Sequence, residues 1–100
     1  MTEAKFPLGR MVATPGALRA LAESTVGEQG LTNIIARHVS GDWGKVAEGD
    51  EGLNDKALET GDRLLSVYKV TDEKSKQPVT LWVITEADRS ATTVLLPEEY

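Results

Sequence analysis

The sequence predicts an α+β fold in which N-terminal helices pack on a C-terminal antiparallel meander of three to four strands. Apolar residues of the first half recur at the three- and four-residue spacing of amphipathic helices, whereas the part after Gly61 is rich in β-formers. A chain of 100 residues has the size of one domain. We therefore expect a single domain over 1–100, with 1–9 as a flexible leader.

Three segments carry the helical pattern. Thr14 and Pro15 are suited to the N-cap and first position of a helix over about 15–24. In the segment 31–38, three apolar residues and a histidine fall at i, i+3, i+4 and i+7, which places them on one helix face. A third helix is expected at 53–60.

Three β-rich segments follow the helices, at 63–70, 79–85 and 91–96, and 10–13 is a brief further strand. Polar links join these three segments, a long one at 71–78 and a tight one at 87–90, so we expect consecutive hairpins.

The segment 79–85 is apolar on both faces. Leu81 and Val83 point to one side of the predicted strand, and Trp82 and Ile84 point to the other. A strand covered on both sides belongs in the middle of a sheet. The sheet face away from the helices must then be covered by the leader or by another molecule.

Composition excludes several classes of function. With 11 Lys+Arg against 16 Asp+Glu, the net charge is −5, which argues against general nucleic-acid binding and favours a basic partner. The chain has no cysteine and one histidine, so we expect no metal site, and no cofactor motif occurs. It shows no signal peptide and no apolar stretch that spans a membrane, so a cytoplasmic protein is expected.

The segment His38-Val-Ser-Gly-Asp-Trp-Gly44 is the first candidate for chemistry. A histidine at a helix end, followed by a tight turn with Asp42, would place an imidazole and a carboxylate within reach of each other. The alternative is that His38 completes a helix face and bonds a backbone carbonyl, with Trp43 in the core.

The second candidate is the polar turn 85–90. Arg89, with Arg63 from the neighbouring strand, would hold a phosphate or carboxylate, and Ser90 and Thr92 would donate hydrogen bonds. The alternative is a β-turn in which Asp88 caps its own backbone and Arg89 pairs with Glu86 or Asp88.

Three blocks of the sequence resemble a group of proteins: HxSGDWG at 38–44, LWVITEADRS at 81–90 and VLLPEEY at 94–100. Over roughly 31–100 the chain resembles short uncharacterised proteins carried by bacterial phages, plasmids and other mobile elements. The resemblance implies a bacterial, cytoplasmic accessory protein and brings no assigned activity.

The order of elements also resembles the barnase–EndoU–colicin–RelE group of small metal-independent ribonucleases. That resemblance implies His38 as acid or base, Arg63 or Arg89 on the scissile phosphate, and Ser90 or Thr92 in support. The sequence departs from this chemistry in its negative net charge and in the lack of a basic groove.

Two hypotheses of function follow. The first is an accessory protein that binds a protein partner through the sheet face with Trp82 and Ile84 or through the acidic loop with Glu48, Asp50 and Glu51; either surface would also serve a homodimer. The alternative is a small ribonuclease or toxin-like enzyme. A purely structural subunit is a third possibility.

Overall fold

The computed structural model describes residues 4–45 and 50–100, and it contains a four-stranded mixed sheet in the order β1-β4-β3-β2. The predicted meander consists of three antiparallel strands, β2 (Leu64–Thr71), β3 (Pro78–Thr85) and β4 (Ala91–Leu95). The brief strand β1 (Arg10–Ala13) lies parallel to β4 at the sheet edge. The predicted α+β class is confirmed, and the parallel edge strand makes the sheet mixed.

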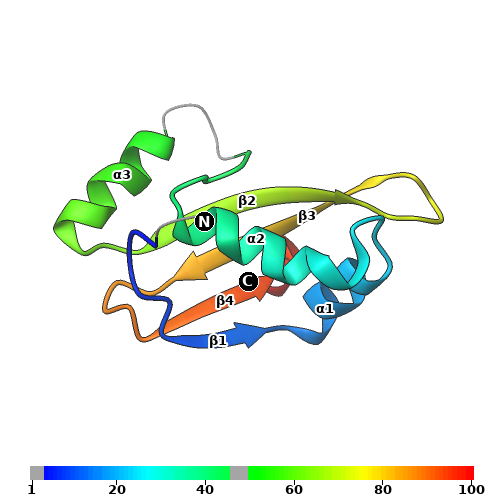
Figure 1. The fold of residues 1–100 in the computed structure, drawn as a ribbon, viewed down its shortest axis with the longest axis horizontal. Helices are drawn as coiled ribbons and strands as arrows, with labels where there is room; N and C mark the ends of the chain where they lie inside the picture. The colour runs from blue at the N-terminus through cyan, green and yellow to red at the C-terminus, as the bar shows by residue number, and fades with distance from the viewer. Residues whose placement is uncertain (1–3, 46–49) are drawn as a thin grey trace.

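The helices occupy one side of the sheet and one of its ends (Figure 1). α1 (Pro15–Ala22) and α2 (Gly30–Val39) lie across one side, which we call the helix face, and α3 (Asp50–Thr60) lies beside the end of β2. The opposite side of the sheet is called the far face. No helix within the described ranges is long and apolar enough to cross a membrane.

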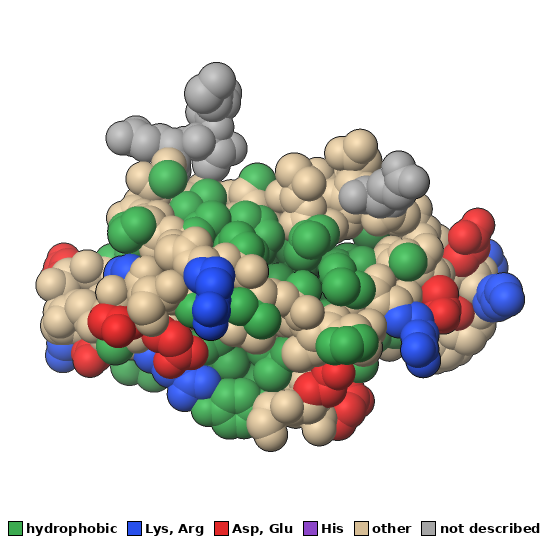
Figure 2. Space-filling model, turned by 90° about the horizontal axis from the view of Figure 1, so that it is seen from below, with side chains coloured by type: hydrophobic (Ala, Val, Ile, Leu, Met, Phe, Trp, Pro, Cys, Tyr) green, Lys and Arg blue, Asp and Glu red, His purple; other side chains and the backbone are tan. Residues whose placement is uncertain are grey.

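β1 forms the lower edge of the sheet in Figure 1. Seen from that side, hydrophobic side chains run across the middle of the molecule, and most charged side chains lie toward its ends and lower rim (Figure 2). The chain leaves β1 through Thr14, whose side chain accepts a hydrogen bond from the Ala17 N–H at 3.1 Å. The predicted N-cap is therefore confirmed.

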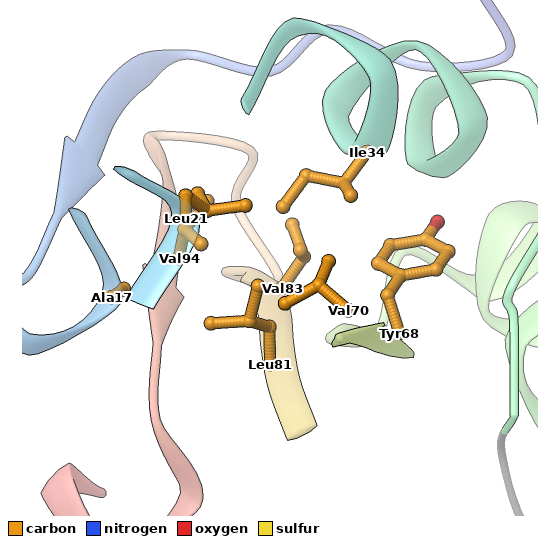
Figure 3. Close-up of a cluster of buried hydrophobic side chains, with 8 residues drawn as sticks. All are labelled: Ala17, Leu21, Ile34, Tyr68, Val70, Leu81, Val83 and Val94. Carbon is orange, nitrogen blue, oxygen red and sulfur yellow. The ribbon is translucent and has the colours of Figure 1, made fainter. Parts of the chain in front are cut away.

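The main core lies between the helix face and α1 and α2 (Figure 3). Alternate residues of β2 point into it, and β3 and β4 contribute in the same way. The buried cluster consists of Ala17, Leu21, Ile34, Tyr68, Val70, Leu81, Val83 and Val94.

β3 lies between β4 and β2, as its pattern predicts. Leu81 and Val83 are fully buried toward the helices, whereas Trp82 and Ile84 point to the far face. An inner strand therefore carries apolar residues on both sides.

The leader differs from the expected flexible segment in residues 4–9. The Lys5 N–H donates to the Val39 carbonyl at 2.8 Å, and Phe6 is buried with its ring 5.2 Å from that of His38 and 6.2 Å from that of Trp43. Burying the Phe6 ring against His38 and Trp43 fixes the segment on the helix side. Residues 4–9 of the leader therefore do not cover the far face.

The outer edge of β2 is closed by other segments. The Asn54 side chain donates to the Leu65 carbonyl at 2.6 Å and accepts from the Leu65 N–H at 3.1 Å. The Val67 N–H donates to the Trp43 carbonyl at 3.0 Å, and the Val67 carbonyl accepts from the Lys45 N–H at 2.6 Å. These bonds satisfy groups that an edge strand otherwise leaves open.

Gly44 is required for this closure. Its φ of +73° is in the left-handed region, and a Cβ at this position would overlap the Val67 carbonyl oxygen.

We expect Gly44→Ala to lower the free energy of unfolding by about 2 kcal/mol or more, measured by urea denaturation. In the control Gly52→Ala, nothing lies within 4 Å of the added Cβ. Because alanine favours a helix more than glycine does, we expect this variant to raise the free energy of unfolding by up to about 1 kcal/mol. Equal effects of the two variants would contradict the steric argument.

Candidate functional site

His38 lies in the last turn of α2 and is completely enclosed, with 0% of its surface exposed. The rings of Phe6 and Trp43 meet it edge-on at 5.2 and 5.7 Å. The predicted pairing with Asp42 is not formed, because the Asp42 carboxylate accepts from the Arg37 side chain at 2.7 Å. His38 therefore has no carboxylate partner in the described structure.

Hydroxyl groups surround the imidazole instead. His38 Nδ1 lies 2.6 Å from Ser66 Oγ, and His38 Nε2 lies 2.9 Å from Thr85 Oγ1. Thr85 Oγ1 is 2.7 Å from Thr92 Oγ1, which donates to the Leu8 carbonyl at 2.7 Å. We call His38, Ser66, Thr85 and Thr92 the imidazole–hydroxyl chain; all four are 0% exposed.

The Leu8 carbonyl fixes the direction of every bond in this chain. A carbonyl only accepts, so the single Thr92 proton is used there and Thr85 must donate to Thr92. His38 Nε2 then carries the proton donated to Thr85, and in the neutral imidazole Nδ1 accepts from Ser66. We assign His38 as the neutral Nε2–H tautomer.

Burial lowers the pKa of His38 from 6.5 to about 4. The charged form would also place a second proton on Nδ1, where the Ser66 hydroxyl now donates. The imidazole is therefore neutral near pH 7. Ser66 and His38 stand at the spacing of a nucleophile and its base, but neither is reachable by a substrate in this structure.

Arg89 and Ser90 belong to the turn between β3 and β4. The Arg89 guanidinium donates to the carbonyls of Asp62 at 2.7 Å, Glu86 at 3.1 Å and Ala57 at 3.2 Å. It thereby joins the turn to the end of α3. The Ser90 N–H donates to an Asp88 carboxylate oxygen at 3.0 Å, as in the β-turn alternative.

The far face carries the second candidate site. Arg63, Leu65, Trp82, Ile84 and Tyr100 line an open pocket of about 280 Å³. The Tyr100 ring meets the Trp82 ring at 5.7 Å with an interplanar angle of 67°, and the Arg63 guanidinium lies 5.1 Å from the Tyr100 ring centre. We call this the far-face pocket.

The structure brings together only some of the predicted site residues. His38 and Thr92 share the imidazole–hydroxyl chain, and Trp82 and Ile84 share the far-face pocket with Arg63. Arg63, just before β2, lines the far-face pocket, whereas Ser66 in β2 points to the helix face, so the sheet separates Arg63 from His38.

The predicted acidic loop is not formed at Asp50 and Glu51, because these residues begin α3. Glu48 and the side chains of Asp50 and Glu51 lie outside the described residues. In the part of the chain that is described, no group of three or more His, Asp or Glu side chains is placed to hold a metal ion.

Sequence reasoning missed Ser66, Thr85 and Tyr100. Ser66 stands between Leu64 and Tyr68 on the buried side of β2, so a polar residue at an apolar position signalled a buried hydrogen bond. Thr85 lies directly opposite Thr92 in the β3–β4 register, which becomes visible once the hairpin is aligned.

No protein-family model, curated protein or solved structure gives a significant match to this chain. The function is therefore inferred from the geometry of the chain itself.

Proposed function

We propose that this chain acts by binding a protein partner through the far-face pocket. The observation that supports the proposal is an open, largely apolar pocket of about 280 Å³ with two aromatic rings and a cation around it. Protein interfaces concentrate their binding energy in tryptophan, tyrosine and arginine. The pocket combines one of each.

The residues of the pocket define the chemistry of the partner. Ile84 is 4% exposed and forms an apolar floor, and Trp82 and Tyr100 offer ring surfaces to an inserted apolar side chain. Arg63 donates to a carboxylate or backbone carbonyl beside that side chain. The net charge of −5 favours association with a partner of positive overall charge.

The resemblance to short proteins of bacterial phages and plasmids suggests the setting of this interaction. In that setting the chain is an accessory protein in the bacterial cytoplasm. The ribonuclease alternative draws no support from the geometry. His38 is enclosed, Arg89 is bonded to backbone carbonyls, and Arg63 is on the other face of the sheet.

Trp82→Ala tests the proposal. Proteins captured from the native host by the wild-type chain are compared by quantitative mass spectrometry with those captured by Trp82→Ala and by the control Leu53→Ala. Leu53 is 65% exposed on α3 and is not among the residues that line the pocket. For a candidate partner purified and titrated by calorimetry, we expect Trp82→Ala to raise the Kd about 30-fold or more and Leu53→Ala to leave it unchanged.

Circular dichroism of each variant separates lost binding from lost folding, and Trp82→Phe keeps an aromatic ring in the pocket. A partner whose affinity does not depend on Trp82 would remove the far-face pocket from the interface. Cleavage of RNA that disappears in a folded His38→Gln variant would replace the binding hypothesis by the enzymatic one.

A further inference from the structure

β1 is an edge strand with an open outer side. It borders β4, and no other described element lies beyond it (Figure 1). The Arg10 N–H donates to the Ser90 carbonyl just before β4 at 2.9 Å, and the Thr14 N–H donates to the Val94 carbonyl in β4 at 3.0 Å. Because alternate residues of a parallel strand face its neighbour, the N–H and carbonyl groups of Met11 and Ala13 point away from the sheet.

The two edges of the sheet differ in how they are protected. The outer groups of β2 are bonded by Asn54 and by the segment 43–45, whereas β1 has no proline, charge or bulge at 11–13. Met11 is 42% exposed and Val12 37% exposed. Figure 2 looks onto this edge, where hydrophobic side chains run across the middle.

We propose that a second copy of this chain pairs with β1, antiparallel, about a two-fold axis at Val12. In this register Met11 lies opposite Ala13 of the second copy, and Ala13 lies opposite Met11. Every outward-facing donor and acceptor of the two residues then finds a partner. The Val12 side chains meet across the axis on the far face.

Charge complementarity supports this register. Arg10 comes to lie opposite Thr14 of the second copy, with both side chains on the far face. The Thr14 hydroxyl donates to Glu99 at 2.5 Å, which holds that carboxylate at the end of β1. Arg10 forms no ion pair among the described residues. In the proposed dimer, Arg10 of each copy lies near Glu99 of the other copy, so the same ion pair forms twice.

Glu99 is ionised in this position. Hydrogen bonds from the Thr14 hydroxyl and the Leu96 N–H hold the pKa of the Glu99 carboxyl below its usual value. An antiparallel pairing of β1 therefore joins an exposed cation to an exposed anion at each end. A strand of four residues makes a small interface, so the dimer is expected to be weak, with a Kd in the micromolar to millimolar range.

Sedimentation equilibrium up to about 1 mM protein tests the proposal. The wild-type chain is expected to approach the mass of two copies as its concentration rises. Val12→Lys places two like charges opposite each other at the axis and is expected to raise the dimer Kd more than tenfold. Leu53→Lys makes the same change at another exposed residue and is expected to leave the Kd unchanged.

Met11→Pro is a second variant, which removes an outward N–H and leaves the bonds to β4 intact. It is also expected to abolish dimerisation in a folded chain. Arg10→Glu and Glu99→Arg are each expected to weaken self-association, and an equimolar mixture of the two is expected to dimerise again.

Amide exchange gives the register directly. Raising the protein concentration is expected to slow exchange at Met11 and Ala13 and to leave Val12, which faces β4, unchanged. A chain that stays monomeric at about 1 mM overturns the proposal. So does a dimer that survives both Val12→Lys and Met11→Pro.

Discussion

His38→Ala is expected to lower the free energy of unfolding by about 3–5 kcal/mol. The substitution leaves the Ser66 proton without an acceptor and the Thr85 oxygen without a donor, in a region that is 0% exposed. It also opens a cavity between the rings of Phe6 and Trp43. Urea denaturation at pH 7 measures the loss.

A triple variant separates the hydrogen bonds from the packing. His38→Phe combined with Ser66→Ala and Thr85→Val fills the space and removes the hydroxyls bonded to the ring. Replacing both partners of a buried hydrogen bond by apolar groups is far less costly than removing one. We expect the triple variant to be more stable than His38→Ala. A loss below about 1 kcal/mol in His38→Ala would show that the ring is not enclosed in solution.

The stability of the chain is expected to fall by about 3 kcal/mol between pH 6.5 and about 4, because of His38. The folded-state pKa is about 4, lower than the ordinary value of 6.5, so the unfolded chain takes up a proton first as the pH falls. Protonation then favours unfolding throughout this window. Above pH 6.5 and well below pH 4, His38 causes no further change in the free energy of unfolding.

The contribution of His38 to the pH dependence of stability can be isolated, since His38 is the only histidine in the sequence. The carboxyls of Asp42, Asp72, Asp88 and Glu99 have pKa values below their ordinary 3.8 or 4.5, so their contribution to folding is lost below those values. Among the described groups with shifted pKa values, His38 therefore dominates the window from pH 4.5 to 6.5. A His38→Gln variant is expected to show a flat stability there, and an unchanged slope would contradict the assignment.

The fold was largely predictable because local patterns agree with the tertiary structure. The Thr14 cap, the helical spacing that ends at His38 and the two-sided pattern of β3 each indicate the element that forms. The parallel position of β1 was not predictable. Four residues fit either strand orientation, and their place beside β4 depends on the path of the leader, which Phe6 fixes in the core.

The candidate sites were predictable only in part. Trp82 and Ile84 follow from alternation, but Tyr100 reaches them through a 3-10 turn (η2, Pro97–Glu99) that no periodicity signals. The carboxylate nearest to His38 in the sequence is that of Asp42, but it forms an ion pair with Arg37. The imidazole instead contacts the hydroxyls of Ser66 and Thr85, which are 28 and 47 residues away in the sequence. Only the register of the strands brings these hydroxyls to His38.

The closed outer side of β2 limits how large an assembly can grow. If two copies join through β1, the strands at both ends of the resulting eight-stranded sheet are β2, since each copy supplies four strands with β2 outermost. Asn54 and the segment 43–45 already occupy the outward backbone groups of Leu65 and Val67, which a third chain would need in order to pair with β2. Polymerisation into open-ended fibrils is therefore blocked by the same short turn that Gly44 makes possible.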